Sequence, residues 1–223
     1  MNWIQESVKR SNNLKDHYKM QEIDIFIKDQ LPSHVDPNLV FSTFSKLIPH
    51  HLLTGVDIVY VGQFDVFKEK QVNAVFQDGA IYVTNEQDSN QDMIDDIVHE
   101  LAHSVEEKFT QYIYDQNDLK NEFVGKRKRL YEILNSYNYD PPLSIKTVYY
   151  YDEKIDMYFY KGVGYEAMWN LVNGLFLTPY STTSLREYFA VGFEHYFMGE
   201  KNTVKKLCPI LYSKLENLEY LEK

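Results

Sequence analysis

The chain has 223 residues, of which 44% are hydrophobic and 15% aromatic, and its 23 basic and 33 acidic residues give a net charge of −10. This length and composition are typical of a globular protein of one or two domains and exclude a disordered chain. Because phosphate contacts need Lys and Arg, the acidic balance argues against nucleic acid as a partner. The single cysteine, Cys208, excludes an internal disulfide and fits a reducing compartment.

The sequence also argues against a membrane role. No stretch reaches 18 apolar residues, and residues 1–13 lack the apolar segment of a secretory signal peptide. We therefore expect a cytoplasmic protein without membrane contacts. A virion-associated protein, or one exported by a route that needs no signal peptide, is the alternative.

The first third of the chain predicts helix and then strands. Residues 1–55 form an expected N-terminal helical segment, in which Asp36-Pro37 begins a helix that Gly55 can end. A β-branched strand is expected at 56–61. Two more strands, at 72–76 and 80–84, flank Asp78-Gly79, which is a hairpin signal.

The second half of the chain predicts mainly helix. The run Lys126-Arg127-Lys128-Arg129 is interpreted as a solvated helix face. The expected elements are a helix at 123–137, a tyrosine-rich β-hairpin at 148–159, a helix at 165–177, and two C-terminal helices from 184 onward that separate near 199 and 209.

Residues 99–103 read His-Glu-Leu-Ala-His and match the pattern H-E-x-x-H. On a helix, residues four apart share one face, so the imidazoles of His99 and His103 could hold one metal ion. Glu100 would then act as a general base toward water that the metal activates. The competing interpretation is a surface helix with two unconnected histidines.

The residues around the motif predict the helix that this chemistry requires. Apolar side chains recur at three- and four-residue spacing from Met93 to Val105, which indicates one buried face. Ser89 or Asn90 can cap the start of the helix. The motif therefore indicates a metal site and not a chance match.

A catalytic zinc site usually has three protein ligands, so one more is expected. Glu187 is the preferred candidate, because a glutamate on a helix that is apolar on most sides needs a partner. Glu194, two turns further on, could support a histidine ligand. His195 is the rival ligand on that helix, and Asn121-Glu122 offers an alternative by its thermolysin-like spacing from the motif.

In these residues the chain resembles the zinc peptidases of the anthrax lethal factor and Pro-Pro endopeptidase group. H-E-x-x-H, the segment Glu187-Tyr188-Phe189-Ala190 and the tail Cys208-Pro209-Ile210-Leu211-Tyr212 are similar to that group. The resemblance covers roughly residues 56–109 and 178–223. It implies that Tyr180, seven residues before Glu187, assists at the oxyanion. The stretch 104–186 is longer than in the group, and Val191 stands where the group often has a second glutamate.

The combined expectation is an α+β, zincin-like metallopeptidase of the gluzincin type. A small sheet packs on the H-E-x-x-H helix, and a helical C-terminal subdomain supplies Glu187. The catalytic domain is expected at 56–223 with an insertion at about 110–178. One Zn²⁺ per chain serves a peptide or protein substrate, which pairs with an exposed strand at 80–84. The alternative is a non-catalytic zincin-like module in a larger assembly such as a phage particle.

Overall fold

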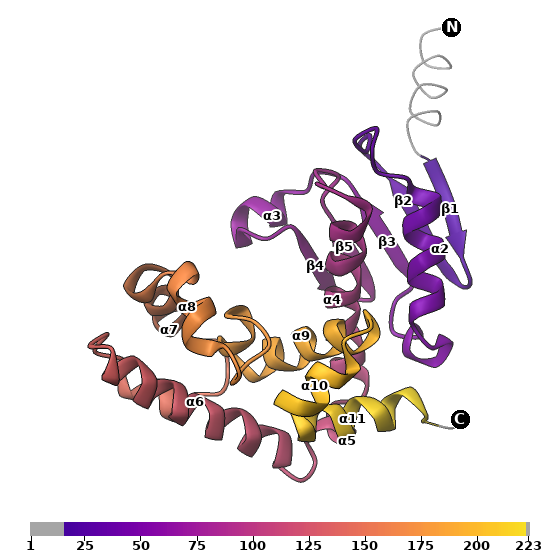
Figure 1. Ribbon diagram of the computed structural model, residues 1–223. Coiled ribbons are helices and arrows are strands. Elements are labelled where there is room, and N and C mark those ends of the chain that lie inside the picture. The colour runs from indigo at the N-terminus through magenta and orange to yellow at the C-terminus, as the bar shows by residue number, and fades with distance from the viewer. Residues whose placement is uncertain (1–15, 222–223) are drawn as a thin grey trace, which may run out of the picture. The chain divides into compact units, whose positions relative to one another are not determined.

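A computed structural model describes residues 16–221, and it has an α+β architecture. A five-stranded mixed sheet is followed by a mostly helical C-terminal region (Figure 1). The chain divides into two compact units, of which unit 1 ends at Val105 and unit 2 begins at Glu106. This boundary lies inside one helix, α4 (Asn90–Lys108). Within the described residues, no helix combines the length and the apolar character that crossing a bilayer requires.

The sheet of unit 1 has the strand order β1-β2-β3-β5-β4. Parallel pairing joins β2 to β3 and β3 to β5, whereas the outer pairs β1–β2 and β4–β5 are antiparallel. The strands are β1 (Asp16–Met20), β2 (Ile23–Ile27), β3 (Ile58–Val61), β4 (Ala74–Gln77) and β5 (Ala80–Val83). Within the part of the chain that the structure describes, β1 and β4 are therefore the edge strands.

The first strands correct the expectation of an N-terminal helical segment. Residues 16–27 form the β1–β2 hairpin and not helix, and β2 pairs with β3 of the following segment. Alternating burial of Ile23, Ile25 and Ile27 explains the strand, because a period of two buries one face of a sheet. Residues 1–15 of the expected segment lie outside the described residues.

The other elements predicted in unit 1 are present, but the helix expected to end at Gly55 ends at Leu47, and the separate 3₁₀ turn η1 (His50–Leu52) follows it. Helix α2 (Pro37–Leu47) begins after Asp36, whose side chain accepts a hydrogen bond from the Asn38 N–H. The β4–β5 hairpin turns at Asp78 and Gly79, whose φ values of 51° and 78° fit a tight two-residue turn. A short helix that the sequence analysis missed, α3 (Asp65–Lys70), connects β3 to β4.

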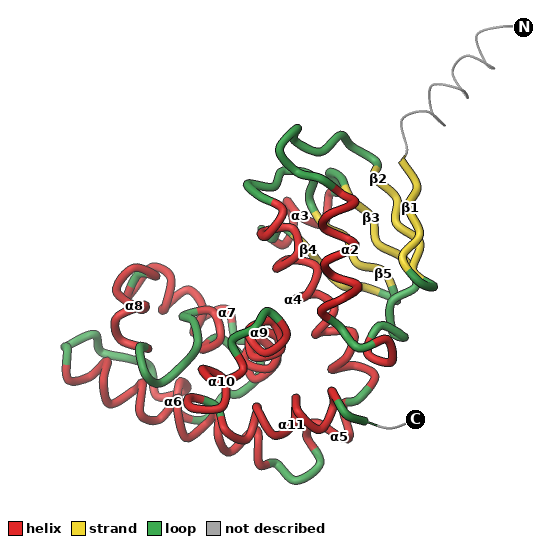
Figure 2. The backbone as a smooth tube through the Cα atoms, turned by 45° about the vertical axis from the view of Figure 1, so that its right-hand side comes forward, coloured by secondary structure: helices red, strands yellow, loops and turns green. Residues whose placement is uncertain are grey.

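Two helices pack their apolar sides on one face of the sheet. Helices α2 and α4 lie against it in both views (Figures 1 and 2). The buried side chains of these helices are Val40, Phe41 and Phe44 on α2, and Met93, Ile94, Ile97, Val98, Leu101, Ala102 and Val105 on α4. The predicted apolar stripe of the motif helix is therefore confirmed as the face that meets the core.

The opposite face of the sheet carries a row of aromatic rings. Phe26 stacks on His17 with ring centroids 4.6 Å apart, and Tyr60 stacks on Tyr82 at 5.2 Å. Register explains the row, because His17, Phe26, Tyr60 and Tyr82 are successive cross-strand partners. These tyrosines thus act as packing material with a polar tip, as expected for most of this tyrosine-rich chain.

Unit 2 is organised around one long helix, α6 (Asp118–Ser136), which contacts α5, α8, α9, α11 and the 3₁₀ turn η2. The helices of this unit, beyond the end of α4, are α5 (Thr110–Tyr114), α6, α7 (Glu153–Met157), α8 (Tyr165–Val172), α9 (Leu185–Phe197), α10 (Lys201–Leu207) and α11 (Pro209–Glu219). The short turns are η2 (Leu143–Lys146), the π-helical turn η3 (Tyr158–Val163) and η4 (Tyr180–Thr182).

Two expectations for unit 2 are wrong. The tyrosine-rich stretch 148–159 forms no hairpin but contains α7, which Asp152 caps by accepting from the N–H groups of Lys154 and Ile155. The C-terminal part has three helices and not two, because Pro209 begins a new helix directly after Cys208. The predicted helices at 123–137 and 165–177 are present, the second ending at Val172.

The basic run on α6 is also different from the expectation of a solvated face. Arg127 is completely buried, and Lys126 is half-buried, while Lys128 and Arg129 are exposed. The Nζ of Lys126 donates to the carbonyls of Leu175 and Leu207, each at 2.6 Å. A run of like charges therefore splits between the core and the solvent, because α6 has other helices on several sides.

Candidate metal centre

The motif helix begins where its sequence predicts. The Ser89 hydroxyl accepts from the Asp92 N–H at 3.1 Å, so Ser89 caps α4. The helix then runs through the whole motif, with His99 half-buried and with His103 and Glu100 buried. The two histidine rings lie 5.2 Å apart between centroids, in agreement with the shared face that spacing by four residues predicts.

Glu187 completes a group of potential metal ligands with these histidines. The ligand atoms of His99, His103 and Glu187 all lie within 4.8 Å of one another. Ser184 caps α9 by accepting from the Glu187 N–H at 3.1 Å, so Glu187 lies in the first turn of that helix. Two imidazoles and one carboxylate are a donor set of catalytic zinc sites, which keep a further position open. The three residues thus fit one metal ion.

Glu100 is positioned by a backbone group of the sheet. Its Oε2 accepts a hydrogen bond of 2.6 Å from the N–H of Phe76 on β4. Phe76 pairs with Ile81 between the two hydrogen-bonded pairs of the hairpin, so its N–H points away from β5 toward the open edge. The edge strand therefore holds the carboxylate beside the two histidines of its own helix.

Asp96 lies one turn before Glu100 on α4. Its Oδ2 accepts from the Gln87 side chain at 2.9 Å, and burial raises the pKa of Asp96 to about 6. The neighbouring carboxylate of Glu100 also raises this pKa, whereas His99 lowers it. Burial in this part of α4 thus favours the neutral form of the Asp96 carboxyl group.

The expected pairing of a substrate with residues 80–84 is not possible in this sheet. Strand β5 is hydrogen-bonded on both sides, to β3 and to β4. Among the described strands, the one with an unpaired side next to Glu100 is β4 (Ala74–Gln77). Sequence reasoning missed this difference because strand order depends on long-range pairing.

The rival ligands have other partners. Glu122 accepts from the Tyr188 hydroxyl and from the N–H groups of Ile210 and Leu211, so it caps α11. The Nδ1 of His195 lies 3.1 Å from Glu200. Neither belongs to the ligand group, and the thermolysin-like alternative is left without support.

The structure does not test the roles expected for Tyr180 and Glu194. Tyr180 lies in η4 and is 43% exposed, and its carbonyl accepts from the N–H and the hydroxyl of Thr183. Its role at an oxyanion stays a prediction. Glu194 is half-buried on α9, two turns after Glu187, and its supporting role stays a prediction as well.

A buried cation that the sequence analysis did not select holds the segment between Tyr180 and Glu187. The Nε of Arg127 donates to the Ile145 carbonyl at 3.0 Å, and its Nη1 donates to the Thr182 carbonyl at 2.5 Å. Burial lowers the pKa of Arg127 to about 10. The sequence did not single out Arg127, because it lies within a run of four basic residues. Its partners are known only from the position of η4 in the structure.

Comparison of the chain with protein-family models, with curated proteins and with solved structures finds no match. The geometry of the site is therefore the basis for any statement about function.

Proposed function

We propose that this protein is a zinc-dependent endopeptidase in which His99, His103 and Glu187 hold one Zn²⁺. The convergence of these three ligand atoms within 4.8 Å, with Glu100 next to His99, is the observation that carries the proposal. Zinc, when bound, lowers the pKa of water to about 7 and polarises a carbonyl. The resemblance to the lethal factor and Pro-Pro endopeptidase group, and with it a zincin-like fold, is part of the proposal.

The residues of the chain would divide the chemistry as follows. Glu100 takes a proton from the attacking water on Oε1, while Phe76 keeps Oε2 in place. It then returns that proton to the leaving amine. Tyr180 donates a hydrogen bond to the developing oxyanion, and an extended peptide pairs with the open edge of β4.

The metal ligands are tested by measuring bound zinc in purified variants. Glu187→Ala should lose most of its zinc, because two histidines alone hold the ion weakly, and Glu122→Ala should keep it. Circular dichroism establishes that both variants are folded. Full zinc retention by Glu187→Ala would remove Glu187 from the site.

Catalysis is tested with an unbiased peptide library and the variant Glu100→Gln. Glutamine keeps the size of the side chain but takes no proton, so cleavage should fall by orders of magnitude while zinc stays bound. Equal cleavage by both proteins would contradict the mechanism. Zinc binding without cleavage by the unaltered protein would instead favour a non-catalytic module, the alternative from the sequence.

A further inference from the structure

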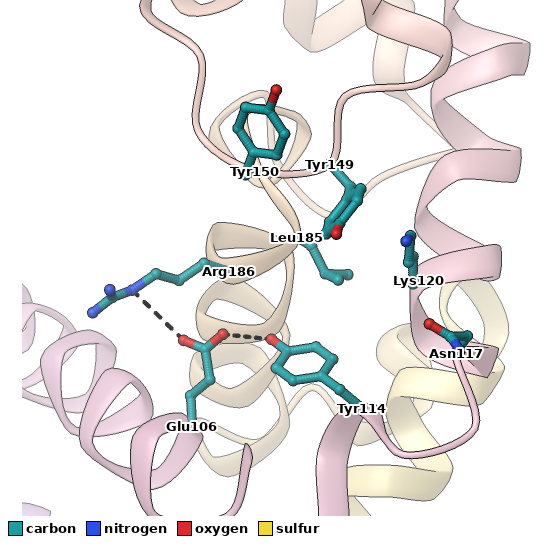
Figure 3. Close-up of a pocket in the computed structure, with 8 residues that line it drawn as sticks. All are labelled: Glu106, Tyr114, Asn117, Lys120, Tyr149, Tyr150, Leu185 and Arg186. Carbon is teal, nitrogen blue, oxygen red and sulfur yellow. Dashed lines mark hydrogen bonds and ion pairs between the residues drawn. The ribbon is translucent and has the colours of Figure 1, made fainter. Parts of the chain in front are cut away.

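A pocket of about 350 Å³ lies in unit 2, next to residues that adjoin the metal ligands in the chain (Figure 3). Glu106, at the end of α4, comes one helical turn after His103. Leu185 and Arg186 directly precede Glu187 on α9. The expected insertion, at about 110–178, provides the other lining residues. The pocket therefore joins the added segment to the beginning of the helix that carries Glu187.

The aromatic wall of the pocket is attached to α9. The N–H of Leu185 donates to the carbonyl of Tyr149 at 2.7 Å, which holds this tyrosine loop two residues from Glu187. The rings of Tyr149 and Tyr150 lie 5.8 Å apart, and Tyr150 is 61% exposed. Exposed aromatic surface beside a pocket is a common feature of ligand sites.

Glu106, the acidic residue that lines the pocket, already has partners within the pocket. Glu106 accepts from the Tyr114 hydroxyl at 2.5 Å through Oε1, and its Oε2 lies 3.6 Å from the Nε of Arg186 (Figure 3). Burial, with the neighbouring Glu106 carboxylate, raises the pKa of Tyr114 well above its usual value, so this hydroxyl stays protonated and keeps donating. Glu106 is thus unsuited to bind a basic ligand.

Lys120 supplies the remaining charge. Its Nζ lies 3.8 Å from the centroid of the Tyr149 ring, and the side chain is half-buried. Within residues 16–221 it has no carboxylate partner. A partly desolvated ammonium group is stabilised most by a carboxylate that replaces its lost water. This local positive charge contrasts with the net charge of −10 of the chain.

We propose that this pocket binds an acidic side chain, aspartate or glutamate, of the peptide substrate. Lys120 pairs with the carboxylate, and Tyr149 and Leu185 contact its methylene groups. An apolar side chain would leave the ammonium group without a partner, and a basic one would be repelled by Lys120. The inference rests on the proposed peptidase function and names its substrate class.

The test is a cleavage profile of an unbiased peptide library with the unaltered protein and with Lys120→Gln. The unaltered protein should cleave peptides with Asp or Glu enriched at one fixed position from the cleaved bond. Lys120→Gln should lose about tenfold or more of that enrichment, as expected for one charge-assisted bond. Lys120→Arg should keep it, and Lys120→Glu should shift it toward Lys and Arg. The matched control is Lys128→Gln, an exposed lysine on the same helix outside the pocket.

A binding experiment separates this inference from the proposed function. Glu100→Gln protein, with and without Lys120→Gln, is used to select peptides from the same library without cleavage. Acidic peptides selected only when Lys120 is present would support the pocket even if the unaltered protein cleaves nothing. Cleavage or selection without acidic preference, or with one that Lys120→Gln leaves unchanged, would overturn the inference. Thermal melting of each variant confirms that it is folded.

Discussion

Each of the two units holds candidate ligand residues, but the units position these residues in different ways. In unit 1, His99, Glu100 and His103 come from five consecutive residues of one helix, and the sheet adds one backbone hydrogen bond from Phe76. In unit 2, Glu187 lies on a helix whose first turn depends on segments far apart in the chain. Local periodicity is thus enough for the first contribution, whereas the second requires tertiary packing.

Helix α6 explains this dependence in unit 2. Glu122, Lys126 and Arg127 each reach backbone groups of other segments, and these partners lie 18 to 89 residues away in sequence. Carbonyl and N–H groups at the ends of short helices have no partner within their own helix. Charged side chains of α6 satisfy them, so this one helix organises the segment that ends in Glu187.

The largest expected effect comes from removing Arg127. Arg127→Leu leaves the carbonyls of Ile145 and Thr182 without their donors. The free energy lost with these hydrogen bonds is larger than the free energy gained by no longer burying a charge. We expect unfolding to become easier by about 3 kcal/mol, with faster amide hydrogen exchange in unit 2 than in unit 1. Chemical denaturation and exchange measurements check this result.

The control for Arg127→Leu is Arg129→Leu, which changes the same residue type two positions away on the exposed side of α6. It should alter stability by less than about 0.5 kcal/mol, as surface substitutions usually do. Equal effects of the two variants would contradict the organising role of α6 and weaken the contrast between the units.

A smaller effect is expected for Tyr180, and it tests the proposed role of this tyrosine at the oxyanion. Tyr180→Phe keeps the ring and removes only the hydroxyl, so zinc content and melting temperature should barely change. The turnover number should fall by roughly 10²-fold with little change in the Michaelis constant, as for loss of an oxyanion donor. A turnover number near that of the unaltered protein would mean that Tyr180 is an ordinary surface tyrosine.

The smallest effect concerns the one hydrogen bond that the sheet gives to Glu100. Phe76→Pro removes the N–H donor at an edge position, where proline is tolerated. We expect kcat/KM to fall by about tenfold, equivalent to about 1.4 kcal/mol, with the zinc still bound. Steady-state kinetics on any peptide that the protein cleaves provides the measurement.

Phe76→Ala is the matched variant, because it removes the ring and keeps the N–H group. If it lowers kcat/KM as much as Phe76→Pro does, the ring and not the hydrogen bond is responsible. The motif helix alone would then position Glu100 for its proposed role, without help from the hydrogen bond to the sheet.

The sequence by itself determined the motif helix and the β4–β5 hairpin with its Asp78-Gly79 turn. It limited the cap of the motif helix to Ser89 or Asn90, and the structure shows Ser89 in that position. These features depend on residues close together in the chain, whose periodicity and backbone preferences act locally. The sequence also singled out Glu187, because a carboxylate on an apolar helix needs a partner. The convergence of Glu187 with His99 and His103 agrees with that reasoning.

Only the tertiary structure decided the strands at 16–27, the strand order and the partners of the basic run. Strands β1 and β2 are stabilised by pairing with each other and with β3, and this pairing overrides local helix preference. Strand order placed β4 and not β5 at the edge beside Glu100. Likewise, charge alone cannot distinguish Arg127 from Arg129 on α6. Arg127 is buried because distant segments bring their carbonyls to it, and no local pattern encodes that arrangement.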